Sequence, residues 1–160
     1  MESDSGNGVK YDDLNSMMAE LSELRHRHRH CLIGFLRHRR LLKNMGSVRE
    51  ELENIRILFA SPGLTAVVSA AQPQIPAHAK SGFLASLSVL CMRLSEIASA
   101  AMRQRDSIGK VVRRLAEWLI RQLVRIMENA KRLLAFKDWS LSVSAGFPTG
   151  ISYSITIDFQ

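Results

Sequence analysis

Residues 139–159, WSLSVSAGFPTGISYSITIDF, alternate apolar and polar side chains on both sides of a turn. The apolar side chains are odd-numbered in both halves, from Trp139 to Ala145 and again from Ile151 to Phe159. A period of two is typical of a β-strand with one buried face, and GFPTG at 146–150 supplies the turn. The sequence therefore predicts a β-hairpin over 139–159. Because an isolated hairpin is only marginally stable in water, we expect it to pack on helices or to pair with another sheet.

Upstream of the hairpin the apolar period lengthens to three or four residues, which indicates helices. One apolar stripe runs from Phe83 to Ala101, and a second runs from Ile108 to Leu133. The polar residues at 103–107 and Gly109 favour a break, so we predict helices over about 83–104 and 108–136 rather than one long helix. Residues 72–82 contain two prolines and are predicted as a loop, whereas residues 64–71 are too short a run to assign.

The N-terminal half predicts two more helices. An apolar stripe from Leu14 to Met45 indicates an amphipathic helix over about 12–45, which Gly46 would end as a C-cap. Ser47 and Glu50 have the spacing of a capping box, which predicts a second helix over about 48–60. We expect these two helices to form an αα-hairpin. Residues 1–10 are predicted to be a flexible acidic tail.

Length and composition predict one domain and an intracellular location. The chain has 160 residues, of which 46% are hydrophobic, enough for a core of its own. We therefore expect residues 11–160 to form a single, mainly α-helical domain: a bundle of three to five helices, with an αα-hairpin at its N-terminal end and a C-terminal β-hairpin. There is no run of 18 uncharged apolar residues and no signal-peptide pattern. Cys31 and Cys91 form no CxxC pair, so we expect a reducing compartment, the cytoplasm or nucleus.

The net charge of +7 is unevenly distributed along the chain. Residues 25–45 hold seven basic and no acidic residues, and residues 103–137 hold ten basic and three acidic residues. Residues 1–24, in contrast, hold one basic and six acidic residues. Two basic blocks of this kind indicate an anionic partner, which would be nucleic acid, an acidic lipid surface or an acidic protein.

Basic residues on or beside the polar faces of these helices are the candidate binding residues. They are Arg25, Arg29, Arg37, Arg40 and Lys43 in the first block, and Arg103, Arg114, Arg121 and Arg125 in the second. On one continuous helix the second group would form a single stripe together with Lys110 and Arg132, partly neutralised by the pairs Asp106–Lys110, Glu117–Arg121 and Glu128–Arg132. Few aromatic residues accompany these cations, so we expect contact with phosphates rather than with bases. The alternative is a solvated helix face that binds nothing.

Catalytic and metal-binding signatures are weak. The chain has no GxxxxGK[ST], GxGxxG or GxSxG motif, so we predict neither an enzyme nor a cofactor. His26, His30 and Cys31 are close in sequence, but a closed zinc site needs a fourth ligand, and we predict no metal site. His28 and His38 fall on the apolar seam, where protonation near pH 6 would loosen the packing.

The leading hypothesis is a non-enzymatic interaction protein that assembles into a homo-oligomer through its helices. Its arginine-rich helix faces would bind the backbone of RNA or DNA, and the sequence does not distinguish the two. The alternative is a structural or signalling adaptor that oligomerises through its helices and C-terminal hairpin and binds an acidic protein surface. Binding to an acidic membrane surface is the third hypothesis, less favoured because the helices need their apolar faces for a core.

Overall fold

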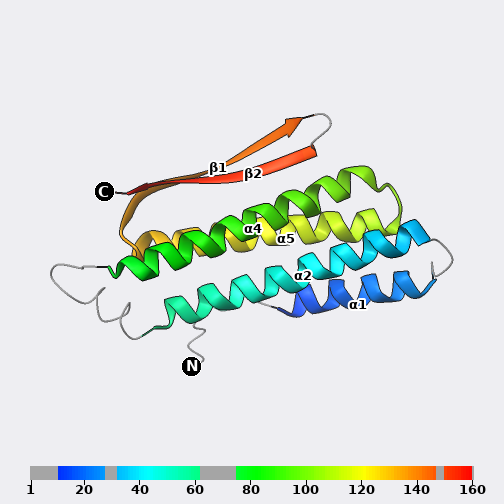
Figure 1. Cartoon of the computed structure of the whole chain (residues 1–160), viewed down its shortest axis with the longest axis horizontal. Coiled ribbons are helices and arrows are strands. Elements are labelled where there is room, and N and C mark those ends of the chain that lie inside the picture. Colours follow the sequence, from blue (N-terminus) through cyan, green and yellow to red (C-terminus); the bar gives the residue numbers. More distant parts are fainter. Residues whose placement is uncertain (1–10, 28–31, 62–74, 147–149, 160) are drawn as a thin grey trace, which may run out of the picture.

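A computed structural model of the chain describes residues 11–27, 32–61, 75–146 and 150–159; of residues 25 and 32–38 it describes the backbone alone. The described elements are α1 (Asp12–Arg27), α2 (Leu32–Phe59), α4 (Ala77–Arg103), α5 (Ser107–Leu133), β1 (Phe136–Gly146) and β2 (Gly150–Phe159). The helices lie side by side, and the hairpin runs along one side of them (Figure 1). The predicted mainly-α fold with a C-terminal hairpin is confirmed.

Helix α4 lies at the centre of the molecule and contacts α2, α5 and β2. An ion pair between Arg40 and Glu96 joins the first half of α2 to the last half of α4. An ion pair between Glu20 and Arg114 joins α1 to the first half of α5. Consequently α1 and α4 end, and α2 and α5 begin, at the same end of the bundle, on the right in Figure 1.

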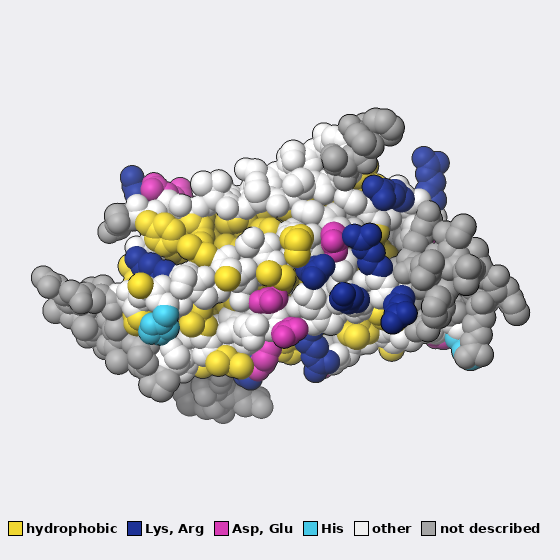
Figure 2. Space-filling view, in the orientation of Figure 1, with side chains coloured by type: hydrophobic (Ala, Val, Ile, Leu, Met, Phe, Trp, Pro, Cys, Tyr) yellow, Lys and Arg dark blue, Asp and Glu magenta, His cyan; other side chains and the backbone are white. Residues whose placement is uncertain are grey.

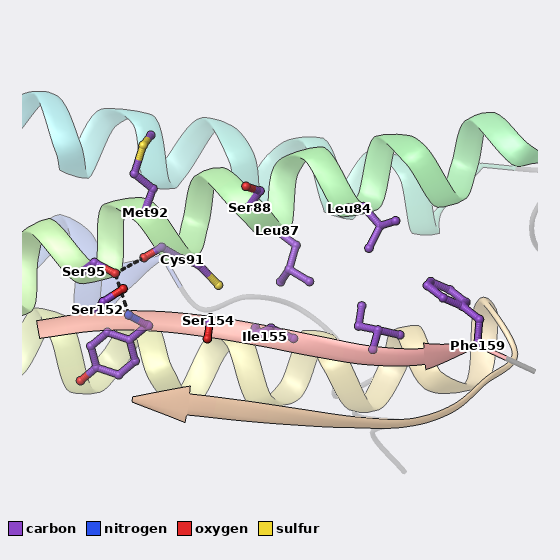
Figure 3. Close-up of a pocket in the computed structure, with 12 residues that line it drawn as sticks. Leu84, Leu87, Ser88, Cys91, Met92, Ser95, Ser152, Ser154, Ile155 and Phe159 are labelled. Carbon is purple, nitrogen blue, oxygen red and sulfur yellow. Dashed lines mark hydrogen bonds between the residues drawn. The ribbon is translucent and has the colours of Figure 1, made fainter. Parts of the chain in front are cut away.

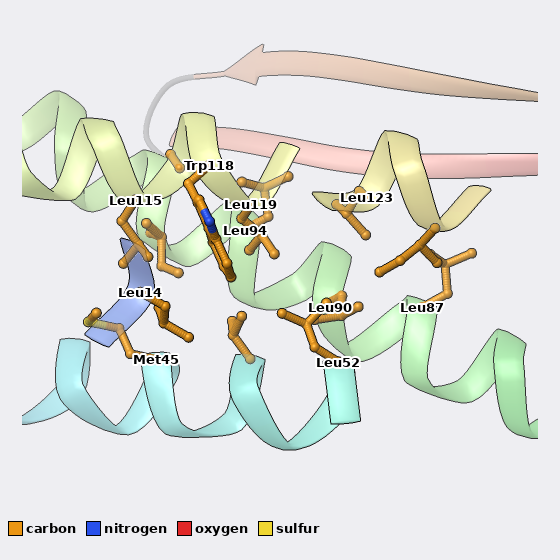
Figure 4. Close-up of a cluster of buried hydrophobic side chains, with 14 of the residues drawn as sticks. Leu14, Met45, Leu52, Leu87, Leu90, Leu94, Leu115, Trp118, Leu119 and Leu123 are labelled. Carbon is orange, nitrogen blue, oxygen red and sulfur yellow. The ribbon is translucent and has the colours of Figure 1, made fainter. Parts of the chain in front are cut away.

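The core is built from the apolar stripes of all four helices together with the start of β1. The indole ring of Trp118 lies among leucines of α1, α4 and α5 (Figure 4). Phe83, Leu90 and Leu94 of α4 are fully buried, which matches the predicted stripe. Burying a side chain of this size contributes about 1.5–3 kcal/mol, so these contacts decide how the helices pack.

The predicted break between α4 and α5 is confirmed. Helix α4 ends at Arg103, and Asp106 caps α5 because its side chain accepts a hydrogen bond from the Gly109 backbone N–H at 3.0 Å. Helix α4 begins at Ala77, earlier than predicted, because Pro76 lies where the helix needs no backbone N–H donor. Helix α5 ends at Leu133 rather than near residue 136, since Ala135 adopts a φ of 48° and β1 then begins.

The predicted division into helices 12–45 and 48–60 is wrong. Helix α2 runs unbroken from Leu32 to Phe59, through Gly46 and Ser47, so there is no capping box and no αα-hairpin at that point. The apolar stripe of Met45, Val48 and Leu52 continues without a change of phase. Burial of that stripe outweighs the cost of about 1 kcal/mol for a glycine inside a helix.

The predictions for several other segments lie outside the described residues. These segments are the acidic tail at 1–10, residues 28–31, most of 62–74, and the centre of the hairpin turn at 147–149.

The hairpin and its predicted apolar face are confirmed. Trp139 pairs with Ile157, Val143 with Tyr153, and Ala145 with Ile151, so the odd-numbered side chains of both strands share one face. Strand β1 starts earlier than predicted, at Phe136, whose ring meets that of Phe159 edge-on with 6.2 Å between the centroids. That contact fixes the open end of the hairpin to the core.

Within the described ranges, α4 is the one helix long and apolar enough by length and composition to cross a membrane. Its central position accounts for the same composition, because a helix covered by α2, α5 and β2 needs apolar side chains on more than one face. The core thus accounts for the buried apolar residues of α4, whereas Leu84, Met92 and Met102 on the same helix are exposed.

Two glycine substitutions test the course of the chain. We expect Gly46→Ala to raise the free energy of unfolding by about 0.5–1 kcal/mol, because Gly46 is helical, exposed and has no atom within 4 Å of an added Cβ. Gly150→Ala should lower the free energy of unfolding by at least about 1–2 kcal/mol, because Gly150 has a φ of +89° and an added Cβ would lie 2.6 Å from Ser99 Oγ. Urea denaturation measures both changes. A destabilising Gly46→Ala would show that α2 is interrupted there.

Candidate nucleic-acid interface

Basic side chains gather at the end of the bundle where α1 and α4 end and α2 and α5 begin. Figure 2 shows Lys and Arg concentrated over that half of the visible face, whereas the other half shows more apolar side chains. We call this surface the basic end; its exposed residues are Arg27, Arg39, Arg40, Lys43, Arg103, Arg105, Lys110, Arg113 and Arg114. Four separate segments of the chain contribute to it, and the antiparallel packing of the helices brings them together.

The acidic residues among these cations are engaged. Glu20 pairs with Arg114, with 2.9 Å between Oε2 and Nη1, and Glu23 pairs with Arg27. Glu96 pairs with both Arg40 and Arg93, and Asp106 caps α5. Within the described residues, several cations of the basic end form no ion pair with any acid: Arg39, Lys43, Arg103, Arg105, Lys110 and Arg113. Their positive charge is therefore largely uncompensated.

A polar network centred on Arg93 holds α2 against α4 beside the basic end. The guanidinium of Arg93 donates to Ser47 Oγ at 3.2 Å, to Asn44 Oδ1 at 3.4 Å and to Glu96 Oε2 at 3.2 Å. Asn44 is only 5% exposed, so this hydrogen bond satisfies a buried amide. Arg40 donates to the other oxygen of Glu96 at 3.3 Å. Ser47, predicted as a helix cap, instead serves this contact between helices.

The charge state of Glu96 depends on its arginine partners. Burial tends to raise the pKa of Glu96, but hydrogen bonds and charge interactions with Arg93 and Arg40 together outweigh burial and hold the pKa below its usual value. The carboxylate is thus ionised at neutral pH and compensates part of the charge of the two arginines. The Glu96 carboxylate thereby holds α2 against α4, and it does not neutralise the other cations of the basic end.

The predicted candidate residues fall into three groups. Arg40, Lys43, Arg103 and Arg114 lie together at the basic end. Arg121 and Arg125 are exposed on α5 but lie farther toward its other end. The side chains of Arg25, Arg29 and Arg37 lie outside the described part of the chain, although α1 and α2 place the backbone of Arg25 and Arg37 near the basic end.

Arg103 and Arg125 do not share the stripe that one continuous helix would give, because α4 and α5 are separate helices that double back on each other, as the predicted break implies. The predicted i,i+4 ion pairs are also not formed. The side chain of Asp106 caps α5, Glu128 Oε1 accepts a hydrogen bond from Trp139 Nε1 at 3.2 Å, and Arg132 donates to Asn129 Oδ1 at 2.6 Å. Lys110 therefore keeps its charge uncompensated.

Five residues of the basic end were not among the predicted binding residues: Arg27, Arg39, Arg105, Lys110 and Arg113. The predicted break near residues 105–109 was the available signal, because a reversal there brings the end of one helix beside the start of the next. The pairing of the start of α2 with the end of α4 had no local signal, since the contact of Arg93 with Asn44 joins residues that are 49 positions apart in sequence.

A groove of about 540 Å³ lies between α4 and β2 (Figure 3). Leu84, Leu87 and Phe159 line it together with serine side chains. Cys91, in its wall, is 7% exposed, and burial raises the pKa of its thiol although a hydrogen bond with the Ile155 backbone opposes this. A protonated, buried thiol is a poor nucleophile, so the groove offers no activated cysteine.

Metal binding finds no support in the described part of the chain, where no group of three or more His, Cys, Asp or Glu side chains could hold an ion. The side chains of His28, His30, Cys31 and His38 lie outside that part.

We expect Glu96→Gln to lower the free energy of unfolding at pH 7 by about 1.5 kcal/mol, a usual value for a hydrogen bond to a charged group. A carboxyl group whose pKa is depressed by folding stabilises the fold above its unfolded-state value of about 4.3, and that contribution is lost as pH falls through the lower folded-state value. The difference between variant and parent should therefore shrink below about pH 4. Denaturation across pH 3–7 measures it.

Glu23→Gln is the matched control, because Glu23 pairs with Arg27 on the exposed surface of one helix. Its effect should stay below about 0.5 kcal/mol at every pH. A pH-independent effect of Glu96→Gln would contradict the role assigned to the ionised carboxylate.

Comparisons with known proteins give no relative for this chain. No protein-family model matches it, and no curated protein or solved structure matches it significantly. Its function is therefore argued from its own charges and contacts.

Proposed function

We propose that this chain is a non-enzymatic interaction protein that binds the phosphate backbone of RNA or DNA through its basic end. The observation that carries the proposal is the set of exposed cations from α2, α4, α5 and the connection between α4 and α5 that form no ion pair within the described residues. Neutralising several phosphates at once releases condensed counterions, which is the main source of affinity in backbone binding.

The basic end is suited to backbone contact rather than to base recognition. Its cations lie on helices that the Arg93 network and the core hold in place, so little side-chain ordering beyond the arginines themselves is needed. Among the described side chains of this end, none is an exposed aromatic ring on which a base could stack. We accordingly expect weak sequence preference and a strong dependence on salt.

The second candidate function is an adaptor that binds an acidic protein surface. Met102, at the end of α4 beside Arg103, is 63% exposed. Phosphate binding does not use an exposed apolar side chain, whereas a protein interface does. Either function fits an intracellular location, in the cytoplasm or nucleus, and neither requires a cofactor.

Fluorescence anisotropy of labelled oligonucleotides, titrated at several salt concentrations, tests the proposal. We expect a plot of log affinity against log salt with a slope of about −4 or steeper, because each neutralised phosphate contributes about −0.9 on duplex DNA. Combining Arg39→Gln, Lys43→Gln, Arg103→Gln and Arg105→Gln should weaken binding at least about tenfold and bring the slope toward zero.

The matched control combines Arg132→Gln and Lys137→Gln, which remove two exposed cations at the other end of α5 and the start of β1. It should change affinity less than about threefold. Arg121→Gln with Arg125→Gln then reports whether the interface extends along α5. Equal losses in control and test variants would contradict a site at the basic end, and no binding near 150 mM salt would favour the adaptor.

A further inference from the structure

Helix α4 carries a row of small side chains that bind the backbone of β2. Ser99 Oγ donates to the Ile151 carbonyl at 3.1 Å, and the Ile151 N–H donates to Ser99 Oγ at 3.0 Å. One helical turn away, the Tyr153 N–H donates to Ser95 Oγ at 2.9 Å (Figure 3). Cys91, one further turn along, makes a hydrogen bond with the Ile155 backbone.

The spacing of this row follows from the geometry of the two elements. Four residues of α-helix rise about 6 Å, and two residues of β-strand rise about 6.6 Å. A helix position repeated every four residues therefore stays beside a strand position repeated every two over several steps. The row Cys91–Ser95–Ser99 thus closes the edge of β2 that faces away from β1.

The same contacts determine which edge of the hairpin stays open. In an antiparallel strand the N–H and C=O of one residue point to the same side, and successive residues alternate. The backbone N–H groups of Ile151 and Tyr153 point toward α4. The backbone hydrogen bonds between the two strands are therefore made by the even-numbered residues of β2 and β1. The backbone groups of Leu141, Val143 and Ala145 therefore point away from β2, and no described residue bonds to them.

The described part of the chain does not protect the open edge against pairing. Figure 1 shows no described element on the outer side of β1. Residues 139–146 contain no charge and no proline, the residues with which proteins usually block an edge strand. Val143 is 58% exposed and Ala145 is exposed as well, so apolar side chains accompany the unpaired backbone groups.

We propose that β1 of a second copy of this chain pairs antiparallel with this edge, about a two-fold axis through Val143. The two hairpins then form one four-stranded sheet. In this register Val143 lies opposite Val143 of the second copy, and Leu141 lies opposite Ala145, a large side chain beside a small one. Each of Leu141, Val143 and Ala145 gives and accepts one backbone hydrogen bond, so all three unpaired residues are used.

A second copy suits this edge for two reasons besides the register. The chain carries a net charge of +7, so two copies repel through most of their surface, and the uncharged segment 139–146 lets them approach. Exposed apolar side chains also occur on the described helices, such as Met92 and Met102, but among the described elements β1 is the one that combines them with an open strand edge. This pairing is independent of the proposed nucleic-acid binding, and either can fail alone.

Analytical ultracentrifugation of the whole chain, with Val143→Pro, tests the pairing. We expect the parent chain to sediment as a dimer, at twice the chain mass of 18.0 kDa. Val143→Pro removes an outward N–H without removing a hydrogen bond between β1 and β2, and proline is tolerated at such edge positions. It should weaken the dimer at least tenfold, while Val143→Thr, which keeps the N–H and the branched side chain, should dimerise. A monomeric parent at 100 µM overturns the proposal.

A crosslinking experiment keeps the proposal testable even where Val143→Pro perturbs the fold. Ser142 of one copy lies opposite Ser144 of the other in the proposed register, within the range of a disulfide. Ser142→Cys mixed with Ser144→Cys should therefore give a crosslinked dimer under mild oxidation, and neither variant alone should exceed the parent chain, which carries Cys31 and Cys91. Equal crosslinking in the single-variant samples overturns the register, and no crosslinking in any sample overturns the interface.

Discussion

The structure depends on the packing of α4, which meets a different neighbour on each of three sides. Toward α2 and α5 it presents Phe83, Leu90 and Leu94, whose burial supplies most of the stabilisation. Toward β2 it presents a row of hydroxyl and thiol groups, which satisfy backbone groups that would otherwise lose hydrogen bonds on burial. A change of helix phase would move both sets out of place, so the position of the hairpin and the packing of the bundle are fixed together.

This arrangement produces two different surfaces. The reversal after Arg103 brings the ends of α1 and α4 and the starts of α2 and α5 together, which concentrates positive charge at one end. The hairpin, in contrast, carries an uncharged edge beyond the closed edge of β2. The two surfaces approach each other at the turn end of the hairpin, because Ile151 bonds to Ser99, one helical turn before Arg103.

The spacing of apolar residues predicted those elements in which the buried residues recur at a regular interval. Burying a whole stripe stabilises the fold more than any single cap or turn does. The spacing therefore found α4, α5 and the hairpin with its apolar face, whereas the pairing of Val143 with Tyr153 comes from the structure. The capping pattern at Gly46 and Ser47 gave a wrong prediction, because burial of the continuous apolar stripe stabilises an unbroken helix there more than a cap would stabilise a break. The Arg93 network and the row on α4 could not be predicted, because serine and arginine at helical positions look like solvent-exposed residues until their distant partners are known. The basic end was predicted in part, residue by residue, but not as one surface.

The most direct test of the central claim is a map of backbone amide chemical shifts during titration with a short single-stranded oligonucleotide. We expect changes confined to the basic end, at residues 39–43, 103–105 and 110–114, with residues 155–159, toward the other end of the hairpin, unaffected. Changes centred on the hairpin or on residues 121–132, or no changes at all, would contradict it.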